Sequence, residues 1–332
     1  SRGPNTMRDD HIEGIGYFVD LQPETEDFLA TVLDGLSQQQ KSIPPKFFYD
    51  AKGSKIFDQI CEAPEYYVTR TEIALMNEIA GEINELVEPG SIVVEYGCGS
   101  SLKIRALLSA LPDPAEYLAI DISKSHLIAT VKEIAADYPK LRVGAICADF
   151  SDALNWPAEA NAERDQRLAF FPGSTIGNQT PEEALQFLER VRHLVGDNGN
   201  LLIGVDLKKD TDVLNRAYND AAGYTADFNL NLLRRIKDEL GGELDISSFE
   251  HDAFYNEDLS RIEMHLVSRL EQSIGIGGQQ FDLLKGESIH TENSYKYSIE
   301  EFIELAGTAG FNSLKTWTDA DNYFSIHYMA AK

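Results

Sequence analysis

The chain has 332 residues, of which 43% are hydrophobic and 10% aromatic, and its formal net charge is −26. This length suits one core domain with a second lobe, and the strongly acidic balance without a basic arm excludes nucleic acid as an expected partner. No stretch reaches the roughly 18 consecutive apolar residues of a membrane span, so we expect no membrane partner either.

The first residues and the cysteines bear on the compartment. Residues 1–6, SRGPNT, resemble a remnant of an expression tag, and the N-terminal sequence does not resemble a signal peptide. Cys61, Cys98 and Cys147 show no CxxC spacing, which is typical of free thiols in a reducing compartment. The seven histidines lack HxxxH and HExxH spacing, so the sequence indicates no metal site. We therefore expect a cytoplasmic protein without metal, and a monomer.

The middle of the chain alternates short apolar runs with amphipathic segments. The apolar runs are residues 91–97, 116–121, 141–149, 167–173 and 200–206. Helical patterns lie between them, for example over residues 125–138 and 181–194. Apolar strands that alternate with amphipathic helices predict a parallel sheet covered on both faces.

This alternation stops after Asp206. The pattern then predicts a helix over residues 228–240 and strands over 261–270 and 286–297. A helix over 297–311 and two closing strands, over 313–320 and 323–331, return the chain to the sheet. We therefore expect a main domain and a second, substrate-binding domain. The main domain comprises residues 72–206 and 299–332, and the second comprises 8–71 and 207–298.

A glycine-rich loop follows the first strand of the alternation. In VEYGCGSS, residues 94–101, Gly97 and Gly99 allow the backbone to approach a ligand closely, which makes them and Ser100 candidates for cofactor binding. A dinucleotide fingerprint would place a third glycine where Leu102 stands. The sequence therefore disfavours a nicotinamide-dependent dehydrogenase, which is the rival class of enzyme.

Acidic residues end the next two strands. Asp121 ends the second strand, where a carboxylate can accept both hydroxyls of a ribose, and Asp149 ends the third strand, followed by Phe150, whose ring can stack on a base. Together with the glycine loop, this order suits S-adenosylmethionine (SAM), a cationic cofactor without phosphates. The alternative is that both aspartates only terminate strands. The expected fold is that of a class I SAM-dependent methyltransferase, Rossmann-like with a seven-stranded sheet.

The loop FFPGSTIGNQT, residues 170–180, is more polar than a plain connection requires. Thr180 and Glu183 predict a capping box at the start of the following helix. Asn178 stands where the methyl donor is expected, and its amide suits a small zwitterion with an ammonium and a carboxylate. A turn in which Asn178 only caps the backbone fits the spacing equally well. The loop lacks the Asn-Pro-Pro-Tyr pattern of amide and nucleobase methyltransferases.

Five segments carry a resemblance to a known family. They are IPPKFFYDAKGSKIFDQICEAPEYYVTRTE (43–72), FFPGSTIGN (170–178), AYNDAAGYTADFNLNLL (217–233), RIEMHL (261–266) and HTENSYKY (290–297). Together they resemble the histidine Nα-methyltransferases of ergothioneine biosynthesis, from about residue 20 to the C-terminus. The resemblance implies that L-histidine is the small-molecule substrate and that three SAM convert it to the trimethyl betaine hercynine. It also implies a class I methyltransferase domain with a separate substrate domain.

The resemblance further implies roles for individual residues. The substrate residues are Tyr49, Tyr67, Asn178, Tyr218, Met264, Glu292 and Ser294, and the cofactor residues include Gly97, Lys103, Asp121, Asp149 and Phe150. Asn178 and Tyr218 match residues that hold the amino and carboxylate groups, and Tyr67 matches a tyrosine beside the reacting amine. Tyr67 and Asn178 are therefore the expected catalytic residues. Glu292 and Ser294 match the pair that recognises the imidazole.

The residues themselves support part of this assignment. Glu292 and Ser294 are two apart in a predicted strand, so their side chains share one face. Such a pair suits an imidazole, although an exposed strand edge with ordinary polar residues is the alternative. A relative that acts on a tryptophan derivative would want apolar residues at positions 292 and 264. A SAM-binding protein without enzymatic activity is a more distant alternative.

Overall fold

The computed structural model describes residues 11–25, 27–99, 101–161 and 166–332. These residues form two compact units. Unit 1 comprises residues 11–25, 71–207 and 297–332, and unit 2 comprises residues 27–70 and 208–296. The expected tag remnant, residues 1–6, lies outside the described residues. None of the helices in the described ranges combines the length and apolar character needed to cross a membrane.

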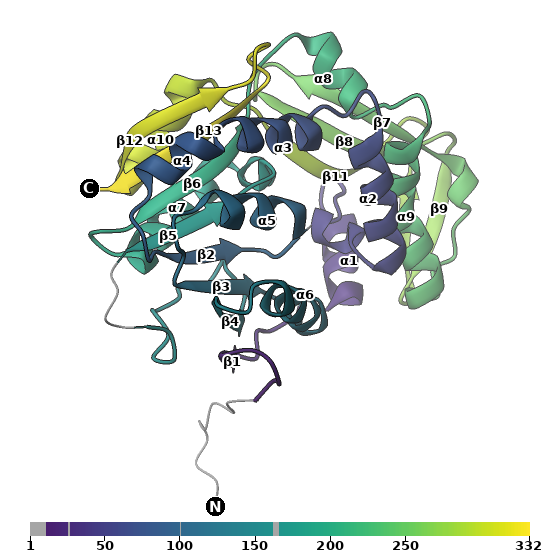
Figure 1. Ribbon diagram of the computed structural model, residues 1–332. Coiled ribbons are helices and arrows are strands. Elements are labelled where there is room, and N and C mark those ends of the chain that lie inside the picture. The colour runs from purple at the N-terminus through teal and green to yellow at the C-terminus, as the bar shows by residue number, and fades with distance from the viewer. Residues whose placement is uncertain (1–10, 26, 100, 162–165) are drawn as a thin grey trace, which may run out of the picture. The chain divides into compact units, whose positions relative to one another are not determined.

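Unit 1 is built on a mixed sheet (Figure 1) in which the described residues form eight strands, in the order β1-β4-β3-β2-β5-β6-β13-β12. The strands are β1 (Tyr17–Asp20), β2 (Ile92–Tyr96), β3 (Glu116–Asp121), β4 (Arg142–Cys147), β5 (Arg167–Phe171), β6 (Asn200–Asp206), β12 (Phe311–Thr318) and β13 (Phe324–Ala331). The first six pair in parallel, whereas β13 is antiparallel to both β6 and β12.

Helices flank this sheet in unit 1. They are α3 (Val68–Glu78, from Thr71 on), α4 (Ala80–Leu86), α5 (Ser101–Ala110), α6 (Lys124–Asp137), α7 (Pro181–Val195) and α10 (Ile299–Ala309). Every residue of β2 is buried, as expected for a central strand covered on both faces. The strand order reverses between β2 and β5, and ligands of doubly wound sheets bind at such a switch point, beyond the carboxyl ends of the strands. The predicted Rossmann-like α/β fold is confirmed.

The edge strand β1 differs from expectation. The sequence predicts seven strands and places residues 8–71 in the second domain, whereas Tyr17–Asp20 pairs with β4 and adds an eighth strand to the described sheet. Its four residues are too few to show a period. The pairing is fixed by distant contacts, because the Tyr17 hydroxyl donates to Glu116 at 2.8 Å. A side chain at Gly144 would overlap the Tyr17 ring, with Cβ 2.0 Å from its nearest atom.

Unit 2 combines helices with two antiparallel sheets. Its helices are α1 (Phe28–Leu36), α2 (Ala51–Glu62), α8 (Thr211–Ala217) and α9 (Tyr224–Leu240). One sheet has the order β11-β8-β7, and the other is the β9–β10 hairpin. The strands are β7 (Phe249–Asn256), β8 (Arg261–Ser268), β9 (Gln272–Ile276), β10 (Gln279–Leu283) and β11 (Ser288–Tyr295). The sequence predicted α9, β8 and β11, whereas the polar runs of β7, β9 and β10 gave no clear period.

Candidate active site

The glycine loop of unit 1 leaves β2 at the switch point. Gly97 has φ +78°, in the left-handed region that favours glycine, and a Cβ there would lie 3.8 Å from the ring of Phe150. At Gly99 a Cβ would meet no described atom within 4 Å, so close packing does not explain that glycine. Leu102 is exposed, and Ser100 lies outside the described residues. The structure thus places Gly97 and Phe150 together at the strand ends.

Asp121 and Asp149 both make the contacts of strand-terminating residues. Asp121 Oδ2 accepts from the backbone N–H of Cys98 at 3.0 Å, and Oδ1 accepts from that of Ser123 at 2.8 Å. Asp149 Oδ1 accepts from the N–H and the hydroxyl of Ser151 at 2.9 and 2.6 Å. Asp121 therefore fixes the glycine loop, and its two oxygens retain lone pairs for further donors. Asp121, Asp149 and Phe150 stay candidates for binding the nucleoside of the cofactor.

Glu72 is a buried residue of unit 1 that the sequence reasoning missed. Its side chain is 1% exposed, and Oε1 lies 2.7 Å from Lys103 Nζ. The carboxylate also accepts from the backbone N–H of Gly173, at 2.8 Å to Oε1 and 3.0 Å to Oε2. Gly204 makes room for it, because a Cβ there would lie 1.9 Å from Oε2. Lys103, expected to contact the cofactor, is thus held by Glu72.

The loop after β5 is held by backbone and side-chain contacts. Ser174 has φ +52°. Its Oγ accepts from the backbone N–H of Asp206 at 2.9 Å, and its carbonyl oxygen accepts from the backbone N–H of Gly177 at 2.8 Å. The 3₁₀ turn η2 (Thr175–Asn178) follows, and the predicted capping box of Thr180 and Glu183 is confirmed. The side chain of Asn178 is exposed and makes no hydrogen bond within the described chain, so it does not cap this turn.

In unit 2, Glu292 and Ser294 lie on one face of β11. Glu292 pairs with Met264 of β8, and Ser294 pairs with Ile262, so the predicted two-residue alternation is present. Met264 is 1% exposed. Burial raises the pKa of Glu292 to about 7, and the positive charge of Lys296 opposes that rise. This face therefore presents one carboxylate and one hydroxyl beside a buried thioether.

Tyr218 is joined to Ser294 by a hydrogen bond. Tyr218 directly follows α8, is buried, and donates its hydroxyl proton to Ser294 Oγ at 3.1 Å. Lys296 Nζ donates to both oxygens, at 2.9 Å to Tyr218 Oη and 3.0 Å to Ser294 Oγ. The Tyr218 hydroxyl therefore donates to Ser294 and accepts from Lys296, which ties the residue after α8 to the end of β11.

The two other predicted aromatics of unit 2 differ in exposure. Tyr67 is buried, its hydroxyl accepts from Lys209 Nζ at 2.5 Å, and that cation lies 4.5 Å from the ring centroid. Tyr49 is 46% exposed, and its ring packs edge-on against Phe57 and Phe228. Lys209 was not predicted from the sequence, because nothing local links it to Tyr67.

A cluster of possible metal ligands also forms in unit 2, which the histidine spacing did not indicate. Potential ligand atoms of Glu263, His265 and His290 lie within 4.8 Å of one another. Glu263 also accepts from Arg261 at 3.0 Å, while His290 contacts the Asn293 side-chain oxygen at 2.7 Å. Burial raises the pKa of Glu263, but its hydrogen bonds outweigh that effect and lower it to about 2. These contacts account for the cluster as a hydrogen-bonded network across β8 and β11.

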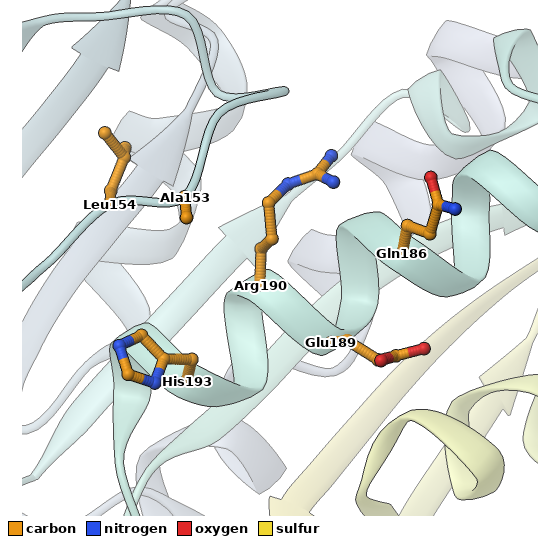
Figure 2. Close-up of a pocket in the computed structure, with 6 residues that line it drawn as sticks. All are labelled: Ala153, Leu154, Gln186, Glu189, Arg190 and His193. Carbon is orange, nitrogen blue, oxygen red and sulfur yellow. The ribbon is translucent and has the colours of Figure 1, made fainter.

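A separate pocket lies in unit 1, on α7 (Figure 2). It has a volume of about 310 Å³ and is lined by Ala153, Leu154, Gln186, Glu189, Arg190 and His193. None of these lining residues belongs to the predicted site. Arg190 reaches the carbonyl of Phe150 at 3.3 Å, which ties α7 to the turn after β4.

The fold and the loops at its switch point define unit 1 as a class I SAM-dependent methyltransferase domain. The model of the family described as "Histidine-specific methyltransferase, SAM-dependent" matches residues 28–331. The chain belongs to this family.

Curated relatives agree with this family assignment. The chain is 38% identical to "Histidine N-alpha-methyltransferase" of Mycolicibacterium smegmatis, over 88% of this chain and 91% of that protein. It is 37% identical to the protein of the same name from Mycobacterium tuberculosis, over 91% of this chain and 94% of that protein. It is 28% identical to "Ergothioneine biosynthesis protein 1" of Neurospora crassa, over 87% of this chain but 33% of that longer protein.

Proposed function

We propose that this chain transfers methyl groups from SAM to the α-amino group of L-histidine and forms hercynine, its Nα-trimethyl betaine, in three successive transfers. This is the first step of ergothioneine biosynthesis. The family assignment supports the reaction class. The polar pair on β11 is the observation that carries the choice of histidine.

The pair Glu292 and Ser294 matches the chemistry of an imidazole ring. A carboxylate accepts an N–H, and a hydroxyl serves the other ring nitrogen. Both side chains share one face of β11, beside Met264 on β8. An apolar ring in the same place would leave these polar groups unpaired, which is the kind of mismatch that rejects an analogue most strongly.

A tryptophan derivative is the second candidate substrate, because one relative has that chemistry in its name. The chain is 30% identical to "4-dimethylallyltryptophan N-methyltransferase easF" of Arthroderma benhamiae, over 86% of this chain. A hydrocarbon-substituted indole favours an apolar pocket. Glu292 and the buried Lys296 make this face polar, so histidine is the better match.

Residues of unit 1 are the candidates for cofactor binding. Asp121 would accept from the ribose hydroxyls, Phe150 would pack on the adenine, and Gly97 would let the backbone approach the cofactor. Lys103 and Glu72 would hold the loop at Gly173 in place rather than contact the cofactor. When bound, SAM supplies a methyl group that is activated as a sulfonium.

The chain's own residues have a limited chemical task. The substrate nitrogen must be neutral and in line with the methyl group, so most of the rate should come from positioning and the exclusion of water. Tyr67 is the candidate that orients the amine, and the ammonium of Lys209 fixes its hydroxyl oxygen. Asn178 is a candidate for the polar groups of the amino acid, since its exposed amide is not used as a cap.

The position of methylation tests this function directly. The protein is incubated with histidine and SAM whose methyl carbon is ¹³C, and the product is analysed by NMR. The proposal predicts three equivalent methyl groups on the α-nitrogen and none on the ring. Methylation of a ring nitrogen, or turnover of tryptophan derivatives but not histidine, would overturn it.

A further inference from the structure

Lys296 is a buried cation whose own role the proposed function leaves open, beyond making the β11 face polar. It directly follows β11 in unit 2, and only 2% of the residue is exposed. Its Nζ lies 5.0 Å from the centroid of the Tyr218 ring, in addition to its two hydrogen bonds. Burying an ammonium costs free energy unless the charge is paired and hydrogen-bonded. Its position therefore calls for a physical reason.

The hydrogen bonds of Ser294 supply that reason. A serine hydroxyl has one proton to donate and two lone pairs to accept with. Ser294 Oγ accepts from Lys296 Nζ at 3.0 Å and from Tyr218 Oη at 3.1 Å. Both acceptor positions are filled, so the only function left to this hydroxyl is to donate its own proton.

Glu292, on the same face, has the opposite character. An ionised carboxylate accepts hydrogen bonds and donates none. Burial favours the neutral acid, and the charge of Lys296 acts in the other direction and favours the carboxylate. Lys296 thus favours Glu292 as a hydrogen-bond acceptor and leaves Ser294 only as a hydrogen-bond donor.

We propose that Lys296 is a positioning residue that sets the substrate's ring charge, because it leaves β11 with one acceptor, Glu292, and one pure donor, Ser294. A neutral imidazole has one N–H and one bare nitrogen, which match this pair. An imidazolium has two N–H groups, of which one would face a hydroxyl with no free lone pair, close to an ammonium. The inference rests on the proposed function, since it takes Glu292 and Ser294 as the ring's partners.

Other ionisable groups surround this face within unit 2. Glu292 interacts electrostatically with Tyr49, Tyr66 and Lys296, and Tyr66 also interacts with Cys61 and Tyr218. Burial raises the pKa of Tyr66 well above its usual value, so it stays neutral where histidine titrates. Of these groups, Glu292 and Lys296 therefore carry charge between about pH 5 and pH 8, as does the ligand; His251, whose Nε2 contacts the Tyr218 carbonyl at 2.8 Å, has its pKa lowered by burial.

The test compares histidine with 1,2,4-triazolylalanine, whose ring stays neutral in acid. Affinities of both ligands are measured by calorimetry from about pH 8 to about pH 5, with S-adenosylhomocysteine present, and expressed as a ratio at each pH. Titration of Glu292 affects both ligands and cancels in the ratio. If only neutral imidazole binds, the ratio in favour of the triazole rises about tenfold per pH unit below the histidine ring pKa of about 6.5.

Variants of Lys296 then show whether the ammonium is responsible. Lys296→Met frees an acceptor position on Ser294 and removes the repelling charge, so the ratio should change by less than about threefold over the same range. Lys296→Arg keeps a cation and donors, and should keep the slope. The matched control is Lys41→Met, which removes a partly buried lysine that pairs with Glu287 in the same unit and should leave the slope unchanged.

Each result has a defined meaning. A flat ratio in the wild type overturns the inference without any variant, and so does a slope in Lys296→Met equal to that of the wild type. If Lys296→Met binds neither ligand, the ratio is measured for Lys296→Gln instead and judged by the same criterion. A loss of slope in Lys296→Arg also contradicts the inference. If the wild type methylates histidine but its affinity ratio is flat, the inference fails and the proposed function stands. If the wild type neither binds nor methylates histidine, the proposed function itself is refuted.

Discussion

The two candidate binding regions are built in different ways. In unit 1 the loop after β2 is shaped by backbone, with Gly97 in a left-handed conformation and the Asp121 carboxylate bound to the N–H of Cys98. In unit 2 the face of β11 is shaped by side chains, since Lys296, Tyr218 and Ser294 determine one another's hydrogen bonds. A backbone-shaped loop can be recognised locally, whereas a side-chain network depends on every partner and should be easier to break.

The largest effect is expected at Glu72. This residue lies in unit 1, but unlike the glycine loop it acts through side-chain contacts. Glu72→Gln keeps a hydrogen-bond acceptor for Gly173 but leaves Lys103 as a nearly buried, unpaired cation. Breaking such a pair should lower the free energy of unfolding by about 3 kcal/mol in denaturant titrations. The control is Glu78→Gln, an exposed change on α3 that should stay within about 0.5 kcal/mol. Equal losses in both variants would contradict the role of the buried pair.

The second effect concerns the side-chain network itself. Glu292→Gln replaces a charged acceptor with a neutral amide and should lower kcat/KM for histidine by about 100-fold, as expected for loss of a hydrogen bond to a charged group. Unfolding experiments should show a folded protein. Glu250→Gln, an exposed carboxylate on β7, is the matched control and should change kcat/KM by less than about twofold. An unchanged rate in Glu292→Gln would remove this residue from substrate recognition.

The third effect is a pH dependence. The pKa of Glu292 is raised to about 7, so the side chain is protonated below that pH and ionised above it. The ionised form is the stronger acceptor for the imidazole N–H, so histidine affinity should rise with pH. We expect an increase of about tenfold between about pH 6 and pH 8, beyond the change seen in Glu292→Gln. Parallel pH profiles for the wild type and this variant would show that Glu292 does not titrate in the site.

The smallest effect is expected at the helix start that follows the polar loop. Thr180→Ala removes the side-chain acceptor for the N–H of Glu183 and half of the capping box. The free energy of unfolding should fall by about 1 kcal/mol, with little change in kcat/KM for histidine. A large loss of activity without loss of stability would show that the loop, and not the cap, depends on Thr180.

The sequence predicted what is local and periodic. The strands Glu116–Asp121 and Asn200–Asp206 have the bounds expected from their apolar runs, and the cap at Thr180 follows from its spacing. The two-residue spacing of Glu292 and Ser294 was enough to place both on one strand face. In each case the signal and the structure it predicts occupy the same few residues.

The sequence could not predict contacts between distant positions. Glu72 meets Gly173, which is 101 residues away, and Lys209 meets Tyr67 across 142 residues. The short strand Tyr17–Asp20 is recognisable only through its pairing with β4. Lys296 stands two residues from Ser294, yet its role needed the position of Tyr218, whose hydroxyl completes the hydrogen bonds of that serine.

The choice of substrate is the central claim, and one measurement tests it most directly. The protein is incubated with SAM and an equimolar mixture of the twenty amino acids, and the mixture is analysed by mass spectrometry. The account predicts that histidine alone gains methyl groups and that it gains three. Methylation of a different amino acid, or no product despite bound SAM, would contradict the assignment of the β11 face to an imidazole ring.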